Sequence, residues 1–79
     1  MGTSLDTLPV GSYAKILDIK ISGKARRRVL DLGFIRGTKI EVVLKSPSGN
    51  TTAYQVRGTL IALRTKETSK IIVERLTNI

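Results

Sequence analysis

The feature that most constrains this chain is the close spacing of its turn-forming residues. Glycine recurs from Gly11 to Gly58, and Pro9 and Pro47 mark two of the turns. The longest unbroken apolar run is the four-residue stretch 60–63. A membrane-spanning helix needs about 20 apolar residues and a secretory signal an apolar core of about 7–15, so the sequence predicts neither. Segments this short predict small strands joined by tight turns.

Several segments between the turns have the composition of strands, because they are rich in β-branched residues or alternate between apolar and polar. In the second of them, Ile40, Val42 and Leu44 alternate with other residues and are expected to share one face. In the first, the adjacent Ile16 and Leu17 interrupt the alternation, which indicates either a bulge or burial on both faces. The strands are predicted at 13–21, 38–45, 51–57, 59–63 and 70–76, with one helical turn at 65–69.

One segment, 24–32, has the composition of a helix and is followed by Gly33, a residue suited to ending it. At 100° per residue, Ala25, Val29 and Leu32 form a stripe that would face the core. Leu30 lies off this stripe, on the side of Arg26.

These elements predict a mainly β fold: a small SH3-like barrel of about five antiparallel strands with one helix inserted after the first strand. An OB-fold is the nearest alternative, but its helix would fall between the third and fourth strands, where this chain has only Arg57 and Gly58. The 79 residues are expected to form a single domain. Residues 1–4 are predicted to be a loose lead-in, which Leu5, Leu8 and Val10 could anchor to the body.

The residue types needed for catalysis and metal binding are missing or scattered. The chain has no cysteine and no histidine, and its six acidic residues show no paired spacing. No glycine-rich phosphate loop or nucleophile motif is present. We therefore expect no enzyme activity, no cofactor, no small-molecule substrate and no specific metal site.

The chain is strongly basic, with 14 Lys and Arg against six Asp and Glu and a formal charge of +8. The densest run, 24–28, lies in the first half of the predicted helix, where the helix dipole disfavours cations. This placement indicates charge kept for a partner, although such runs are usually solvated faces. A nucleic-acid-binding barrel is one reading, but only three aromatic residues are available for base stacking.

Four stretches in order resemble the FeoA family. Residues 27–38 (RRVLDLGFIRGT) resemble its R-x-L-x-x-L-G-h-x-P-G-x stretch, and Pro47 and Gly49 fall where the family has its P-x-G hairpin. Residues 58–64 (GTLIALR) resemble G-x-x-h-A-L-R, and Ile71 and Val73 match the closing I-x-V strand. The chain departs from the pattern at Arg36, where the family commonly has proline.

The resemblance implies a small cytosolic SH3-like protein that accompanies FeoB, the membrane ferrous-iron transporter with a cytoplasmic GTPase domain. It implies an accessory or regulatory role in ferrous-iron uptake, exerted by protein–protein contact, and a cytoplasmic location peripheral to the inner face of the membrane. A weak homo-oligomer is a further expectation. Transition-metal binding is attributed to the family, but this sequence offers no evident ligands. The alternative function is a small basic nucleic-acid-binding barrel.

The sequence also suggests where a partner would bind. One hypothesis is an apolar patch of Leu30 and Phe34 ringed by arginines, because apolar centres with charged rims are typical of interfaces. The alternative is that both residues plug the end of the barrel beneath the helix. The candidate partner-interaction residues are Arg26, Arg27, Arg28, Leu30, Phe34 and Arg36.

Overall fold

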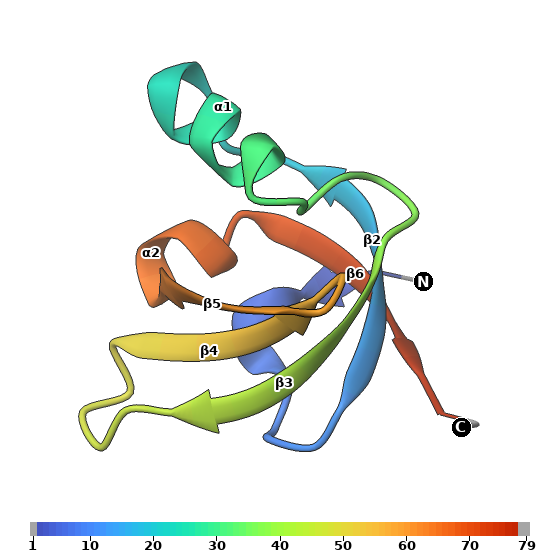
Figure 1. The fold of residues 1–79 in the computed structure, drawn as a ribbon, viewed down its shortest axis with the longest axis vertical. Coiled ribbons are helices and arrows are strands. Elements are labelled where there is room, and N and C mark those ends of the chain that lie inside the picture. The colour runs from blue at the N-terminus through green and yellow to red at the C-terminus, as the bar shows by residue number, and fades with distance from the viewer. Residues whose placement is uncertain (1, 78–79) are drawn as a thin grey trace.

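The computed structural model describes residues 2–77, in which one antiparallel sheet of six strands curls around a single core (Figure 1). The strand order is β1-β6-β2-β3-β4-β5, and every neighbouring pair is antiparallel. The predicted mainly β, antiparallel architecture with a helix inserted early in the chain is confirmed, but the sheet has six strands rather than about five because the short first strand was not predicted, so the helix follows the second strand. The elements are β1 (Thr3–Ser4), η1 (Leu5–Thr7), β2 (Tyr13–Ile19), α1 (Gly23–Asp31), β3 (Lys39–Lys45), β4 (Thr51–Val56), β5 (Thr59–Arg64), α2 (Thr65–Thr68) and β6 (Ile71–Leu76).

The glycine after α1 ends the helix as its position predicted. Gly33 has φ +105°, a conformation that residues with a Cβ rarely adopt, and its N–H donates to the carbonyl of Leu30. The α1–β3 connection then crosses the top of the barrel (Figure 1). Among the described residues, no helix is long and apolar enough to cross a membrane.

The expectation of a loose lead-in at residues 1–4 is wrong for Thr3 and Ser4. These residues form β1 and pair with β6 through Thr3↔Val73 and Ser4↔Ile72. The pairing covers one edge of β6 that would otherwise expose unpaired backbone groups. Leu5 is fully buried and Leu8 nearly so, whereas Val10 is 53% exposed.

Two bulges interrupt the sheet. In β2 the register against β6 shifts between Ile16 and Asp18, so the bulge is the correct one of the two predicted explanations. A second shift, in β3 between Val42 and Leu44, was not predicted. It turns Leu44 to the surface, where 61% of the residue is exposed, so the expectation that Leu44 shares the face of Ile40 and Val42 is wrong.

The core lies inside the curled sheet and is closed at one end by residues of α1 and the α1–β3 connection. Val29 is the residue of α1 that is buried, and Phe34 follows it into the core. The rings of Phe34 and Tyr54 meet edge to face, with centroids 6.0 Å apart and planes at 88°. Ala25, Leu30 and Leu32 are partly buried against this core.

Candidate interaction surfaces

The structure removes Phe34 from the predicted partner-binding patch. Its exposed fraction is 0%, and its ring packs against Tyr54. A side chain without exposed surface cannot contact a partner while the fold is intact, so this part of the prediction is corrected. Leu30 is only partly buried, and its inner side packs on the core.

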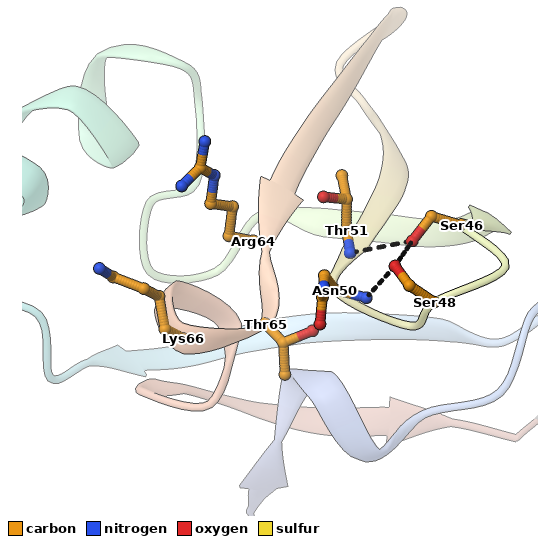
Figure 2. Close-up of a pocket in the computed structure, with 7 residues that line it drawn as sticks. All are labelled: Ser46, Ser48, Asn50, Thr51, Arg64, Thr65 and Lys66. Atoms are coloured by element: carbon orange, nitrogen blue, oxygen red, sulfur yellow. Dashed lines mark hydrogen bonds between the residues drawn. The ribbon is translucent and has the colours of Figure 1, made fainter.

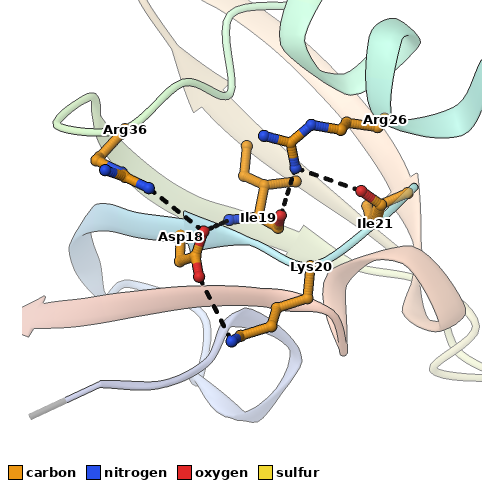
Figure 3. Close-up of polar contacts among 6 residues, drawn as sticks. All are labelled: Asp18, Ile19, Lys20, Ile21, Arg26 and Arg36. Carbon is orange, nitrogen blue, oxygen red and sulfur yellow. Dashed lines mark hydrogen bonds and ion pairs between the residues drawn. The ribbon is translucent and has the colours of Figure 1, made fainter. Parts of the chain in front are cut away.

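Two of the predicted arginines are engaged by the end of β2 (Figure 3). Arg26 donates from Nη1 to the carbonyl oxygens of Ile19, at 2.5 Å, and Ile21, at 3.4 Å. These carbonyls lie just where β2 stops pairing, so Arg26 satisfies backbone acceptors that the sheet leaves free. The contact also fixes α1 to the strand that precedes it.

Arg36 lies beside Asp18, which is near the same end of β2. Its Nη2 lies 3.6 Å from Oδ1 of Asp18, and Nζ of Lys20 lies 3.5 Å from Oδ2 (Figure 3). The Ile19 N–H also donates to Asp18, at 2.8 Å. This backbone hydrogen bond and the two cations hold the pKa of the Asp18 carboxyl below its usual value.

Arg28 joins the two helices. Its guanidinium forms an ion pair with Glu67 of α2, and the Arg64 N–H donates to the same carboxylate at 3.2 Å. Partial burial alone would raise the pKa of Glu67. The hydrogen bonds from Arg28 and the Arg64 backbone outweigh that effect and hold the pKa below its usual value.

Three members of the predicted patch also line one hollow on α1. Arg26, Arg27 and Leu30 line a shallow hollow of about 420 Å³ together with Gly23 and Asp31. Arg27 is exposed and forms no ion pair with any residue in the range 2–77. A partner-binding role for this face of α1 stays a prediction.

A second surface, on the outer side of β3, β4 and β5, was missed by the sequence reasoning. The register places Leu44 beside Ala53 and Ala53 beside Ala62, so an apolar row crosses three strands. Leu60, 55% exposed, lies two residues before Ala62 and flanks this row. Pro47, at the β3–β4 turn, lines the same hollow of about 430 Å³ as Leu44, Ala53 and Ala62.

Cations border one end of this apolar row. Lys45 lines the apolar hollow, and Arg64 and Lys66 line both of the adjoining hollows. One of these, lined also by hydroxyl-bearing residues of the β3–β4 turn, is drawn in Figure 2. In that view the Arg64 and Lys66 side chains extend to the side away from Ser46 and Ser48.

The other hollow lies between α1 and the β5–α2 junction. Its residues include Ala25 and Arg28 of α1 and Glu67 of α2. Within residues 2–77, Lys45, Arg64 and Lys66 form no ion pairs, whereas Glu67 is already paired with Arg28. The β3–β5 surface, as we name it, comprises Leu44, Lys45, Ala53, Leu60, Ala62, Arg64 and Lys66.

Signals for this surface exist in the sequence but are weak. Leu60 and Ala62 belong to the longest apolar run, and strict alternation would have assigned both to one face. The position of Leu44 depends on the bulge, which the regular pattern of residues 38–45 conceals. Across the described range, no group of three or more acidic residues comes together to hold a metal ion.

A curled antiparallel sheet with a helix after β2 defines a small SH3-like module. Comparison with known proteins gives the family directly. The FeoA domain family matches residues 3–75, nearly the whole sequence, and the chain belongs to that family. It is therefore a non-catalytic domain associated with ferrous-iron transport.

Relatives of known structure share the fold closely. An FeoA-like protein from Clostridium acetobutylicum is 35% identical, with a TM-score of 0.88 over 99% of this chain and 91% of that one. The FeoA protein of Stenotrophomonas maltophilia, described as a procaryotic SH3 domain protein and solved with zinc, is 29% identical. Its TM-score is 0.79, over 91% of this chain and 89% of that one.

A relative from Porphyromonas gingivalis links the family to a transporter within one polypeptide. It is a fusion of Fe(2+) transport protein A with the Fe(2+) transporter FeoB, 31% identical over 74 residues. The match covers 94% of this chain but only 9% of the relative. The transport activity of that larger protein is therefore not carried over with the match.

Proposed function

We propose that this protein is an accessory or regulatory module of ferrous-iron uptake that acts by direct contact with a FeoB-type transporter on the cytosolic side of the membrane. The observation that carries the proposal is the fusion relative, in which a segment similar to nearly the whole of this chain is joined to FeoB. Covalent fusion raises the effective concentration of one protein beside the other, which suits two proteins that act by contact.

The surface of the protein supports a contact role. Leu44 and Leu60 are more than half exposed on one face, and exposed apolar residues with a charged border are typical of interaction sites. The alternative of nucleic-acid binding has less support. Phe34 and Tyr54 are buried, and Lys39 lies over the Tyr13 ring at 5.3 Å, so the aromatic residues offer no free stacking platform.

The test is affinity capture with the full chain from detergent-solubilised membranes of the source cells, with and without nuclease. We expect the FeoB-type transporter to be recovered in both conditions. Deletion of the gene should change ⁵⁵Fe²⁺ uptake, and the wild-type chain should restore it. Recovery of nucleic acid without the transporter, together with unchanged iron uptake, would replace this proposal with the nucleic-acid alternative.

A further inference from the structure

The β3–β5 surface combines three properties that point to one kind of partner. Its centre is apolar, with Leu44 61% and Leu60 55% exposed, although Leu44 belongs to a strand whose other apolar side chains face inward or are half covered. Leaving large apolar side chains in water is unfavourable by about 25 cal/mol for each Å² that could be buried, so their exposure favours a partner that covers them. The apolar row runs unbroken across three strands.

The border of this surface is positively charged, and its cations can form further ion pairs. Lys45, Arg64 and Lys66 have no ion-pair partner within residues 2–77. Of the acids on this side of the sheet, Glu67 is paired with Arg28 and also attracts Arg64, and Glu41 lies in register with Gln55 in the row that ends at Leu60. The cations at this border therefore outnumber the acids available to balance them.

The positive charge of this border indicates which kind of partner would cover the surface. A second copy of the chain would bring together two molecules of formal charge +8 and would place the same unpaired cations against one another. An acidic segment with apolar side chains would instead cover Leu44 and Leu60 and neutralise Lys45, Arg64 and Lys66. Charge complementarity thus favours an acidic protein partner over self-association.

We propose that the β3–β5 surface binds an acidic, partly apolar segment of the transporter partner. This inference rests on the proposed function, which names the transporter but not the surface or the chemistry of the contact. In this arrangement the apolar row supplies affinity, while Arg64 and Lys66, at the mouth of the hollow under α1, orient carboxylates of the bound segment.

The first experiment measures the Kd of the full chain for the purified, detergent-solubilised FeoB-type transporter of the same genome. The variants are Leu44→Lys and Lys66→Glu. Their matched controls are Ile35→Lys, another exposed apolar position, and Arg27→Glu, an exposed cation without an ion pair in the described range. We expect Kd to rise at least about tenfold for Leu44→Lys and about fivefold for Lys66→Glu, and less than about twofold for either control.

The controls also test the competing surface, since both lie in or beside the patch that the sequence predicted around α1. If Ile35→Lys and Arg27→Glu weaken binding while the β3–β5 variants do not, the contact lies there and this inference is overturned. If all four variants bind like the wild type, the proposed function stands and the β3–β5 surface is rejected. If the wild type does not bind the transporter, the proposed function fails and this inference fails with it. All four substituted positions are exposed, so circular dichroism should show unchanged folding.

The second experiment identifies the bound segment. A photoreactive benzophenone side chain replaces Ala62, which is exposed in the apolar row, and cross-linked peptides are sequenced by mass spectrometry. We expect a transporter segment with more acidic than basic residues. A neutral or basic segment, a cross-link to a second copy of this chain, or Leu44-dependent binding to phosphatidylglycerol vesicles in place of the transporter would each overturn the proposal.

Discussion

Three arginines of α1 and the α1–β3 connection carry the same charge as the cations at the border of the β3–β5 surface but have a different role. Arg26 donates to two backbone carbonyls, Arg28 pairs with Glu67 and Arg36 faces Asp18. These three hold α1 and the α1–β3 connection in place. Arg64 and Lys66 form no ion pair in the described part of the chain. A dense run of arginines is therefore a poor guide to a binding surface when a local backbone or carboxylate can use the charge.

The largest expected effect is on stability, and it distinguishes the buried residue Phe34 from exposed residues. Phe34→Ala should lower the free energy of unfolding by about 3–5 kcal/mol, because it removes a fully buried ring and leaves a cavity beside Tyr54. Ile35→Ala, at a 38% exposed neighbour, should change it by less than about 0.5 kcal/mol. Urea denaturation measures both. A Phe34→Ala protein of normal stability that no longer binds the transporter would restore Phe34 to the interface.

The next effect tests how tightly the end of α1 rests on the barrel. Gly33→Ala and Gly37→Ala both place a Cβ at positive φ, +105° and +90°, so both should destabilise the protein. The new Cβ at position 33 would lie 3.3 Å from Cγ1 of Val56, whereas none at position 37 meets an atom within 4 Å. We expect Gly33→Ala to lower the free energy of unfolding by about 1 kcal/mol more than Gly37→Ala, as measured by thermal denaturation. Equal losses would mean that the packing under Gly33 relaxes freely.

A smaller effect concerns the structural arginines. Arg26→Ala should lower the free energy of unfolding by about 1 kcal/mol, because two carbonyl acceptors at the end of β2 lose their charged donor. Arg27→Ala, next to it but without such contacts, should lie within about 0.5 kcal/mol of the wild type. Amide hydrogen exchange of α1 should accelerate in Arg26→Ala alone. Identical exchange rates in the two variants would show that the Arg26 hydrogen bonds do not stabilise α1.

The smallest effect is a pH dependence. The pKa of Glu67 in the folded protein lies below its ordinary value of 4.5, so the unfolded chain binds a proton more readily than the folded one. The stabilisation from Glu67 is therefore complete above about pH 4.5 and is lost as the pH falls through the lower folded pKa. Melting temperatures from pH 3 to 6 should fall less steeply at the acid end for Glu67→Gln than for the wild type. Parallel curves would show that the ion pair between Arg28 of α1 and Glu67 of α2 does not contribute to stability.

Much of the fold could be predicted from the sequence because local signals and tertiary structure agree. Gly33 ends α1 where expected, and β4 and β5 meet at the two-residue turn of Arg57 and Gly58, where both φ angles are positive. The lead-in was misread because the pairing of Thr3 with Val73 joins opposite ends of the chain. A two-residue strand has no periodicity for a sequence pattern to reveal.

The interaction surface was harder to predict, for two physical reasons. A bulge changes which side of the sheet a side chain faces, and the one in β3 sends Leu44 outward from a segment whose alternation looks regular. Burial depends on long-range packing, so the sequence left two readings of Phe34, a surface contact and a core plug. Contact with Tyr54, 20 positions away, decides between them.

The pairing of β1 with β6 determines where another polypeptide could be joined to this one. β1 and β5 stand at opposite ends of the strand order, and the end of β6 lies across the molecule from the β3–β4 turn (Figure 1). A partner segment tethered after β6 must reach around a body measuring 33 × 28 × 24 Å. The root-mean-square span of a flexible Gly/Ser chain is about 5–6 Å × √n, so it matches about 30 Å at roughly 30 residues. In single-chain versions with tethers under about 10 residues, which extend at most about 3.3–3.6 Å per residue, the segment could not reach the β3–β5 surface.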